Sequence, residues 1–67
     1  MPSAVIARWR YFPEVRVLEI VFQTGRVYHY QDVPPTIDEG LRRATSRGEY
    51  FNENIRDRFE FERIANI

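Results

Sequence analysis

The chain has 67 residues, among them ten arginines and ten acidic residues, and it contains neither lysine nor cysteine. A length of this order predicts one small domain, and the lack of cysteine excludes a disulfide framework and thiolate metal sites. The zero formal net charge argues against strong non-specific binding of nucleic acid, because dedicated nucleic-acid binders are usually basic overall.

No window approaches the apolar length of a membrane-spanning helix, and the first residues lack the basic and apolar regions of a secretory leader. The expected compartment is therefore the cytoplasm, in a bacterium or in the host cell of a phage. The ten aromatic residues are expected to build a core large enough for so short a chain.

An alternating pattern predicts a first strand over 4–11, where apolar and aromatic side chains alternate with arginines. Pro13 removes a ladder donor and fixes φ, which favours a turn over 12–14. Arg8 is then expected to lie opposite Glu19 of the next strand and to form a cross-strand ion pair with it.

The clearest strand covers 15–22, and both of its faces are largely apolar, which predicts a central position in the sheet. A three-residue loop over 23–25 follows, with Gly25 in the left-handed region, since a two-residue turn would force the β-branched Thr24 to positive φ. The predicted cross-strand pairs are Phe22–Arg26, Ile20–Tyr28 and Leu18–Tyr30. Both tyrosines then lie on the same face of the sheet as their partners.

A third strand is predicted over 26–31, and two prolines end it because neither can continue the ladder. The second of them, Pro35, suits the first turn of a helix predicted over 35–45. A buried stripe at helical spacing is formed by Ile37, Leu41 and Ala44. Gly40 is expected to weaken this helix by up to ~1 kcal/mol relative to alanine.

A second helix is predicted over 49–58, after a break at 46–48. The tail over 59–64 alternates apolar and charged residues, so it predicts either a short fourth strand near 59–61 or an extended segment packed over the core. The whole pattern predicts an α+β fold, a three-stranded antiparallel β-meander followed by two short helices packed on one face, with the short C-terminal strand as an addition.

Six short motifs occur in a distinctive order along the chain. They are Met1-Pro2-Ser3, Tyr11 to Pro13, Gly25 to Tyr30, Val33-Pro34-Pro35, Ser46 to Asn52, and Ile55-Arg56. In this order they resemble the KTSC domain, which is named for its occurrence at the C-terminus of some lysyl-tRNA synthetases. The resemblance covers nearly all of 1–67 as a single domain. The chain departs from the family pattern at Ala4, Arg47 and Glu60, where serine, lysine and proline are common.

The resemblance implies a small non-catalytic binding module, with RNA as the ligand class. The residues expected to contact RNA are Arg26, Tyr28, Tyr30, Asn52 and Arg56. The tyrosines, which form the central Tyr–any–Tyr motif of the family, would stack on unpaired bases, and the other side chains would contact phosphates or bases. Two alternatives stay open: the tyrosines pack in the core under the helices, and Arg56 pairs with a nearby glutamate.

A protein-interaction adaptor is the second interpretation, because arginine and tyrosine are enriched at protein interfaces. Spacing along the chain offers no nucleophile–base pair, so we expect no enzyme and no catalytic residues. His29 stands alone without a second histidine or a cysteine nearby, and we expect it to face solvent on the second face of the sheet, with no metal and no cofactor. The expected partners are RNA or a protein, without a membrane, for a monomer or a homodimer paired through sheet edges.

Overall fold

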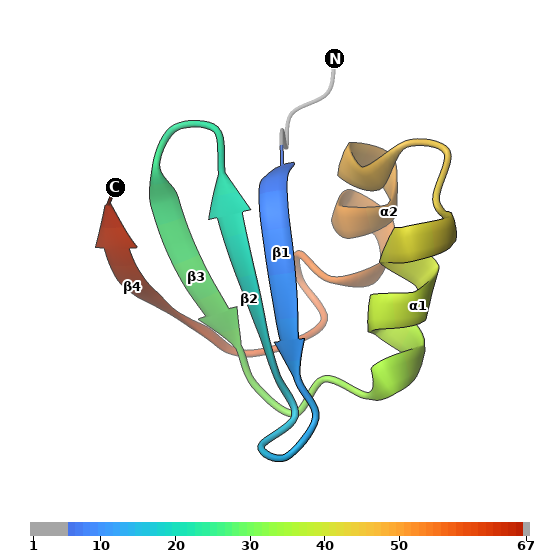
Figure 1. Cartoon of the computed structure of the whole chain (residues 1–67), viewed down its shortest axis with the longest axis horizontal. Coiled ribbons are helices and arrows are strands. Elements are labelled where there is room, and N and C mark those ends of the chain that lie inside the picture. Colours follow the sequence, from blue (N-terminus) through green and yellow to red (C-terminus); the bar gives the residue numbers. More distant parts are fainter. Residues whose placement is uncertain (1–5, 67) are drawn as a thin grey trace.

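The computed structural model describes residues 6–66, so the expected start of the first strand at residue 4 lies outside the described part. The elements follow in the order β1 (Ile6–Phe12), β2 (Val17–Phe22), β3 (Arg26–Tyr30), α1 (Pro35–Arg43), α2 (Arg47–Asn54) and β4 (Phe61–Asn66) (Figure 1). The strands form one antiparallel sheet in the order β1-β2-β3-β4. The predicted α+β class is confirmed, and so is a fourth strand at the C-terminus.

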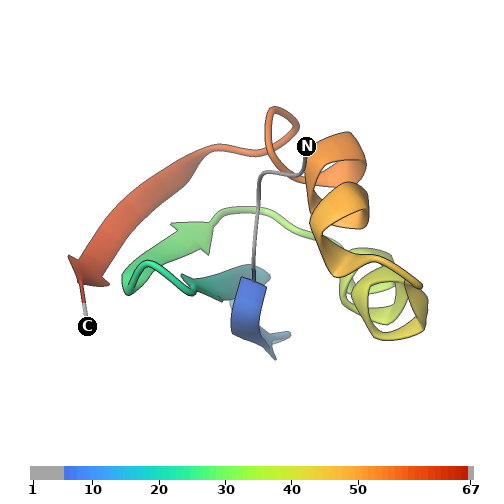
Figure 2. The same cartoon turned by 90° about the horizontal axis from the view of Figure 1, so that it is seen from above.

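The sheet is curved, with β4 at one end of the curve and the two helices beyond the other (Figure 2). Both helices bury side chains against the same face of the sheet, because Leu18 and Ile20 of β2 share one buried cluster with Leu41 of α1 and Phe51 of α2. None of the helices within the described range is long and apolar enough to cross a membrane.

The register between β2 and β3 is the predicted one, with Leu18 opposite Tyr30 and Ile20 opposite Tyr28. Gly25 has a φ of 95°, and its N–H donates to the carbonyl of Phe22 over 2.9 Å. Because side chains alternate between faces at a period of two, this loop is what puts the two tyrosines under the helices.

The turn between β1 and β2 is longer than predicted. Val15 N–H donates to Phe12 O over 3.3 Å, as expected for a turn with proline at its second position, but Arg16 continues the turn with a φ of 56°. The carbonyl of Arg16 accepts a hydrogen bond of 2.8 Å from Val33 N–H, which ties this turn to the segment before α1. Strand β2 therefore begins at Val17 and not at residue 15.

The longer turn also moves the register of β1 by two residues. Arg8 lies opposite Val21, and it is Arg10 that lies opposite Glu19. The expected pair of Arg8 with Glu19 is therefore wrong. Glu19 instead meets His29, with 2.9 Å between Oε2 and Nε2, on the second face of the sheet. His29 lies on this second face as predicted, but it is only partly open to solvent, with 28% of its side chain exposed.

Both helices end earlier than predicted. Helix α1 ends at Arg43, and α2 runs from Arg47 to Asn54 with Ser46 as its N-cap, whose side chain accepts a 3.3 Å hydrogen bond from Glu49 N–H. Strand β4 covers Phe61–Asn66 and not 59–61. The segment between α2 and β4 turns the chain back across the sheet, so that β4 can pair with β3.

Gly40 of α1 has a packing role that outweighs its low helix propensity. A Cβ built on Gly40 would overlap the ring and hydroxyl of Tyr50 in α2. The lack of a side chain at this position therefore lets the two helices approach each other closely.

Asp38 of α1 is 8% exposed and joins the helices to the sheet. It accepts a 2.9 Å hydrogen bond from Trp9 Nε1 of β1 and a 3.1 Å hydrogen bond from Arg42. The guanidinium of Arg47 lies over the Trp9 ring at 4.8 Å from the centroid. One indole therefore contacts residues of both helices and anchors them beside β1.

Candidate functional site

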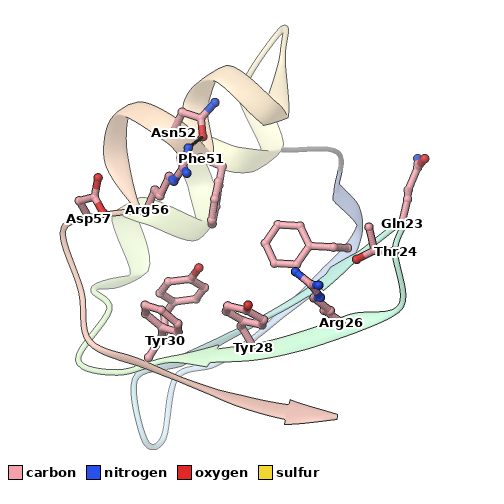
Figure 3. A pocket seen from close by; sticks show the side chains of 11 residues that line it. Gln23, Thr24, Arg26, Tyr28, Tyr30, Phe51, Asn52, Arg56 and Asp57 are labelled. Atoms are coloured by element: carbon pink, nitrogen blue, oxygen red, sulfur yellow. Dashed lines mark hydrogen bonds between the residues drawn. The ribbon is translucent and has the colours of Figure 1, made fainter. Parts of the chain in front are cut away.

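A groove of about 660 Å³ opens between β3, β4 and the end of α2 (Figure 3). Its lining consists of Phe22, Gln23, Thr24, Arg26, Tyr28, Tyr30, Phe51, Asn52, Arg56, Asp57 and Phe61. The lining includes all five residues that the sequence nominated for RNA contact, although they come from two separate parts of the chain. The structure therefore brings the whole nominated set to one surface.

Two local periodicities bring these residues together. Arg26, Tyr28 and Tyr30 alternate along β3 and so project from the same face. Asn52 and Arg56 are four residues apart, and Arg56 lies just past the end of α2, where its N–H closes the helix end by a 2.9 Å bond to the carbonyl of Phe51.

Arg56 Nη1 donates to Asn52 Oδ1 over 3.4 Å, a weak contact between exposed groups. Within the described residues Arg56 forms no ion pair, so the alternative in which it pairs with a nearby glutamate is not seen. Its guanidinium keeps most of its donors for a ligand.

The aromatic floor of the groove consists of Tyr28, Tyr30 and Phe61. Phe61 lies parallel to Tyr28, with ring centroids 5.1 Å apart and planes 12° apart, and it is 5.3 Å from Tyr30. Phe61 is 50% exposed, so part of its ring is accessible to a ligand. It gives the groove an open aromatic surface.

The two tyrosines differ in their surroundings. Tyr30 is only 2% exposed and belongs to the core cluster, so core packing is the correct interpretation for this ring. Tyr28 is half-buried and borders the groove between Tyr30 and Phe61. The ring surfaces on which a planar ligand can stack therefore belong to Phe61 and Tyr28.

Burial raises the pKa of Tyr30 to about 12, and the neighbouring Tyr28 and Asp57 act in the same direction, while the nearby Arg56 opposes them. The phenol therefore stays protonated at neutral pH, and its hydroxyl can donate a hydrogen bond at the end of the groove where Arg56 and Asp57 also lie (Figure 3).

The charged groups of the groove stand at its two ends. Arg26 lies near the hairpin loop, beside Gln23 and Thr24, whereas Arg56 and Asp57 lie at the opposite end (Figure 3). Two guanidiniums and one carboxylate make the groove positive in a chain of zero net charge. This combination suits a ligand that is planar in one part and anionic in another.

Sequence reasoning missed Phe61, Asp57 and Phe51 as parts of the groove. The alternation of apolar and charged residues at 59–61 indicates a strand that contains Phe61. It places Phe61 in the groove only when the pairing of β4 with β3 is known. No local pattern indicated Asp57, which lies in the irregular turn after α2.

Comparison with known proteins gives matches along most of the chain. A family model described as the KTSC domain matches residues 2–59. A lysine–tRNA ligase of Nostoc punctiforme is 39% identical over 63 residues, which are 94% of this chain and 11% of the ligase. A protein of Stutzerimonas stutzeri is 42% identical over 53 residues, which are 79% of this chain and 75% of that protein.

The fold has a close counterpart among solved structures. The crystal structure of a KTSC domain protein from Yersinia pestis superposes with a TM-score of 0.87 at 30% sequence identity, covering 97% of this chain and 94% of that one. By contrast, the chain spans only 11% of the length of the lysine–tRNA ligase relative, so the activity of that whole protein does not transfer with the match.

Proposed function

The chain belongs to the KTSC domain family, and from that premise we propose that it is a non-catalytic module that binds single-stranded RNA in the groove. The observation that carries this proposal is the arrangement of two guanidiniums, Arg26 and Arg56, at opposite ends of an open aromatic floor. Single-stranded nucleic acid offers the complementary arrangement, with flat bases joined to phosphates.

Stacking of a base on an aromatic side chain contributes roughly 1–3 kcal/mol and needs an exposed ring face. Phe61 and the accessible part of Tyr28 offer such a surface. Guanidiniums hold phosphate oxygens through paired hydrogen bonds, so Arg26 and Arg56 would position the backbone on either side of a stacked base. A groove of about 660 Å³ has room for a short segment of one or two nucleotides.

The lysine–tRNA ligase relatives support RNA as the ligand class. A segment similar to this chain is part of proteins whose name includes a transfer RNA. An accessory domain that holds unpaired RNA would serve such a protein without taking part in its chemistry. Ligase activity itself forms no part of the proposal.

The absence of catalysis is also part of the proposal. His29 is the chain's single histidine, and it lies on the face of the sheet away from the groove, where it contacts Glu19. The groove lining therefore has no histidine to act as a base for the hydroxyl groups of Thr24 or Tyr30. We further propose a cytoplasmic location in a bacterium or an infected host cell, without a cofactor.

A protein-interaction adaptor is the competing function, and one observation favours it. Strand β4 is an edge strand that carries two exposed apolar side chains, Phe61 at 50% and Ile64 at 48%. A peptide could add a further strand along β4 and cover both side chains. Such a partner would need both of them, whereas RNA in the groove would need only Phe61.

Fluorescence anisotropy with labelled pentauridine and labelled transfer RNA tests the proposal. Arg26→Gln should weaken binding at every sequence and lower the salt slope by about one unit, because one phosphate contact is lost. Arg8→Gln is the matched control, since Arg8 is exposed on β1 opposite Val21, on the face of the sheet away from the groove. Equal effects of the two substitutions, or no binding of either RNA at low salt, would overturn the proposal.

A further inference from the structure

Asp57 is the acidic residue of the groove lining, and phosphate binding does not account for it. Within the described residues its carboxylate has no hydrogen bond and no ion pair. It follows the C-terminal end of α2, where the helix dipole favours cations over anions. A carboxylate in this position also repels a phosphate backbone, so a groove that bound only phosphates would be better without it.

The groups around Asp57 form a pattern of hydrogen-bond acceptors and donors. The carboxylate of Asp57 offers two acceptor oxygens, while the Tyr30 hydroxyl and the Arg56 guanidinium at the same end of the groove offer donors (Figure 3). Arg26 stands alone at the far end, with the aromatic floor between. The groove is therefore asymmetric along its length: each end has a guanidinium that suits a phosphate, and the end with Asp57 also suits a polar base edge.

Guanine is the RNA base whose edge matches this pattern. Its N1–H and N2–H₂ groups are adjacent donors that fit the two oxygens of one carboxylate, and its O6 beside them is an acceptor for a hydroxyl or guanidinium. Adenine and cytosine present one amino group beside an acceptor nitrogen, and uracil presents one N–H between two acceptors. None of these three bases can give two adjacent donors to a carboxylate.

We propose that the groove selects guanine in single-stranded RNA. Asp57 accepts from the N1–H and N2–H₂ groups, and a donor from Tyr30 or Arg56 meets O6. The base stacks on Phe61 and Tyr28, and its phosphate lies towards Arg26. This inference rests on the proposed function and goes beyond it, because RNA binding through the floor and the arginines alone would be independent of the base.

Binding of five labelled pentamers, UUUUU, UUGUU, UUAUU, UUCUU and UUIUU with a central inosine, tests the inference by anisotropy. The chain should bind the guanine pentamer roughly fivefold more tightly than the other four, at the lower end of what a paired base contact provides. Inosine is the sharpest comparison, because it differs from guanine only by the missing N2 amino group.

Asp57→Asn should abolish the guanine preference and tighten binding of UUUUU, since it removes a charge that repels the phosphate backbone. Glu53→Gln is the matched control, because it also removes one exposed negative charge near α2 but lies outside the groove lining. Equal binding of all five pentamers, or a guanine preference that survives Asp57→Asn, would overturn the inference and leave the RNA-binding proposal standing. Failure to bind any pentamer would overturn both.

Discussion

The ring of Phe51 meets the ring of Tyr30 edge-on, with centroids 5.8 Å apart and planes 78° apart. Both rings are almost fully buried, at 3% and 2% exposed. Phe51 comes from α2 and Tyr30 from β3, so this contact holds the helical side of the groove against its sheet side. The distance between Asn52 and Arg56 on one side and Arg26 on the other is therefore set by the core.

Phe61→Ala should weaken RNA binding by roughly 1–3 kcal/mol, the loss of one stacked base. Its effect on folding should be smaller than that of a core truncation, because the ring is half exposed in the folded chain. Anisotropy and urea denaturation measure the two effects separately.

Ile64→Ala is the matched control for Phe61, because both side chains lie on β4 and are about equally exposed. The RNA account expects Ile64→Ala to leave RNA affinity unchanged. Equal losses at the two positions would instead favour a partner that covers the whole edge strand.

Gly40→Ala should destabilise the fold by about 1–3 kcal/mol through overpacking, although alanine is the better helix former. The added methyl group would overlap the end of the Tyr50 side chain, so this ring or the two helices would have to shift. Urea denaturation of Gly40→Ala with and without Tyr50→Ala tests this cause. In the Tyr50→Ala background the alanine at position 40 should become neutral or stabilising, and an unchanged cost would contradict the account.

Trp9→Phe should destabilise the fold by roughly 1–3 kcal/mol, because it leaves the nearly buried Asp38 without its indole donor. A double-mutant cycle with Asp38→Ala, which leaves no acceptor for the indole, isolates the hydrogen bond from the loss of ring area. A coupling energy near zero in thermal or urea unfolding would indicate that the bond contributes nothing to stability.

Stability should fall as the pH rises from about 10 to about 12. The tyrosine pKa is about 10 in the unfolded chain, whereas burial raises that of Tyr30 to about 12 in the folded one. Between these values the unfolded chain loses its proton first, so deprotonation favours unfolding, by up to about 3 kcal/mol. Urea midpoints across this range should fall less steeply in Tyr30→Phe, and parallel pH profiles would contradict the assignment.

Much of the fold follows from local signals in the sequence. Gly25 is the residue that tolerates positive φ in its loop, and this one position determined the β2–β3 register and the face of both tyrosines. The β1–β2 turn gave no such signal, because Arg16 takes positive φ without being a glycine and is held by a hydrogen bond from the distant Val33. The error in the Arg8–Glu19 pair came from that turn.

The groove could be predicted only in part for a similar reason. The five residues expected to contact RNA follow local periods in the sequence. Arg26, Tyr28 and Tyr30 are spaced two residues apart along β3, and Asn52 and Arg56 are four residues apart at the end of α2, so each group was expected on one face. The position of Phe61 in the groove depends on the pairing of β4 with β3, two strands that are far apart in the sequence. In this pairing Phe61 lies opposite Tyr30, which is 31 residues earlier in the chain. The burial of Tyr30 depends on where Phe51 docks, and no local pattern encodes that contact.

Amide NMR of the whole chain during titration with single-stranded RNA would locate the RNA-binding surface residue by residue. We expect chemical-shift changes at Arg26, Tyr28, Asn52, Arg56 and Phe61 that weaken steeply as salt is raised from low to moderate concentration. His29 and Glu19 on the opposite face serve as the internal control and should remain unchanged. No shifts at low salt, or shifts centred on His29 and Glu19, would contradict the assignment of the groove as the RNA site.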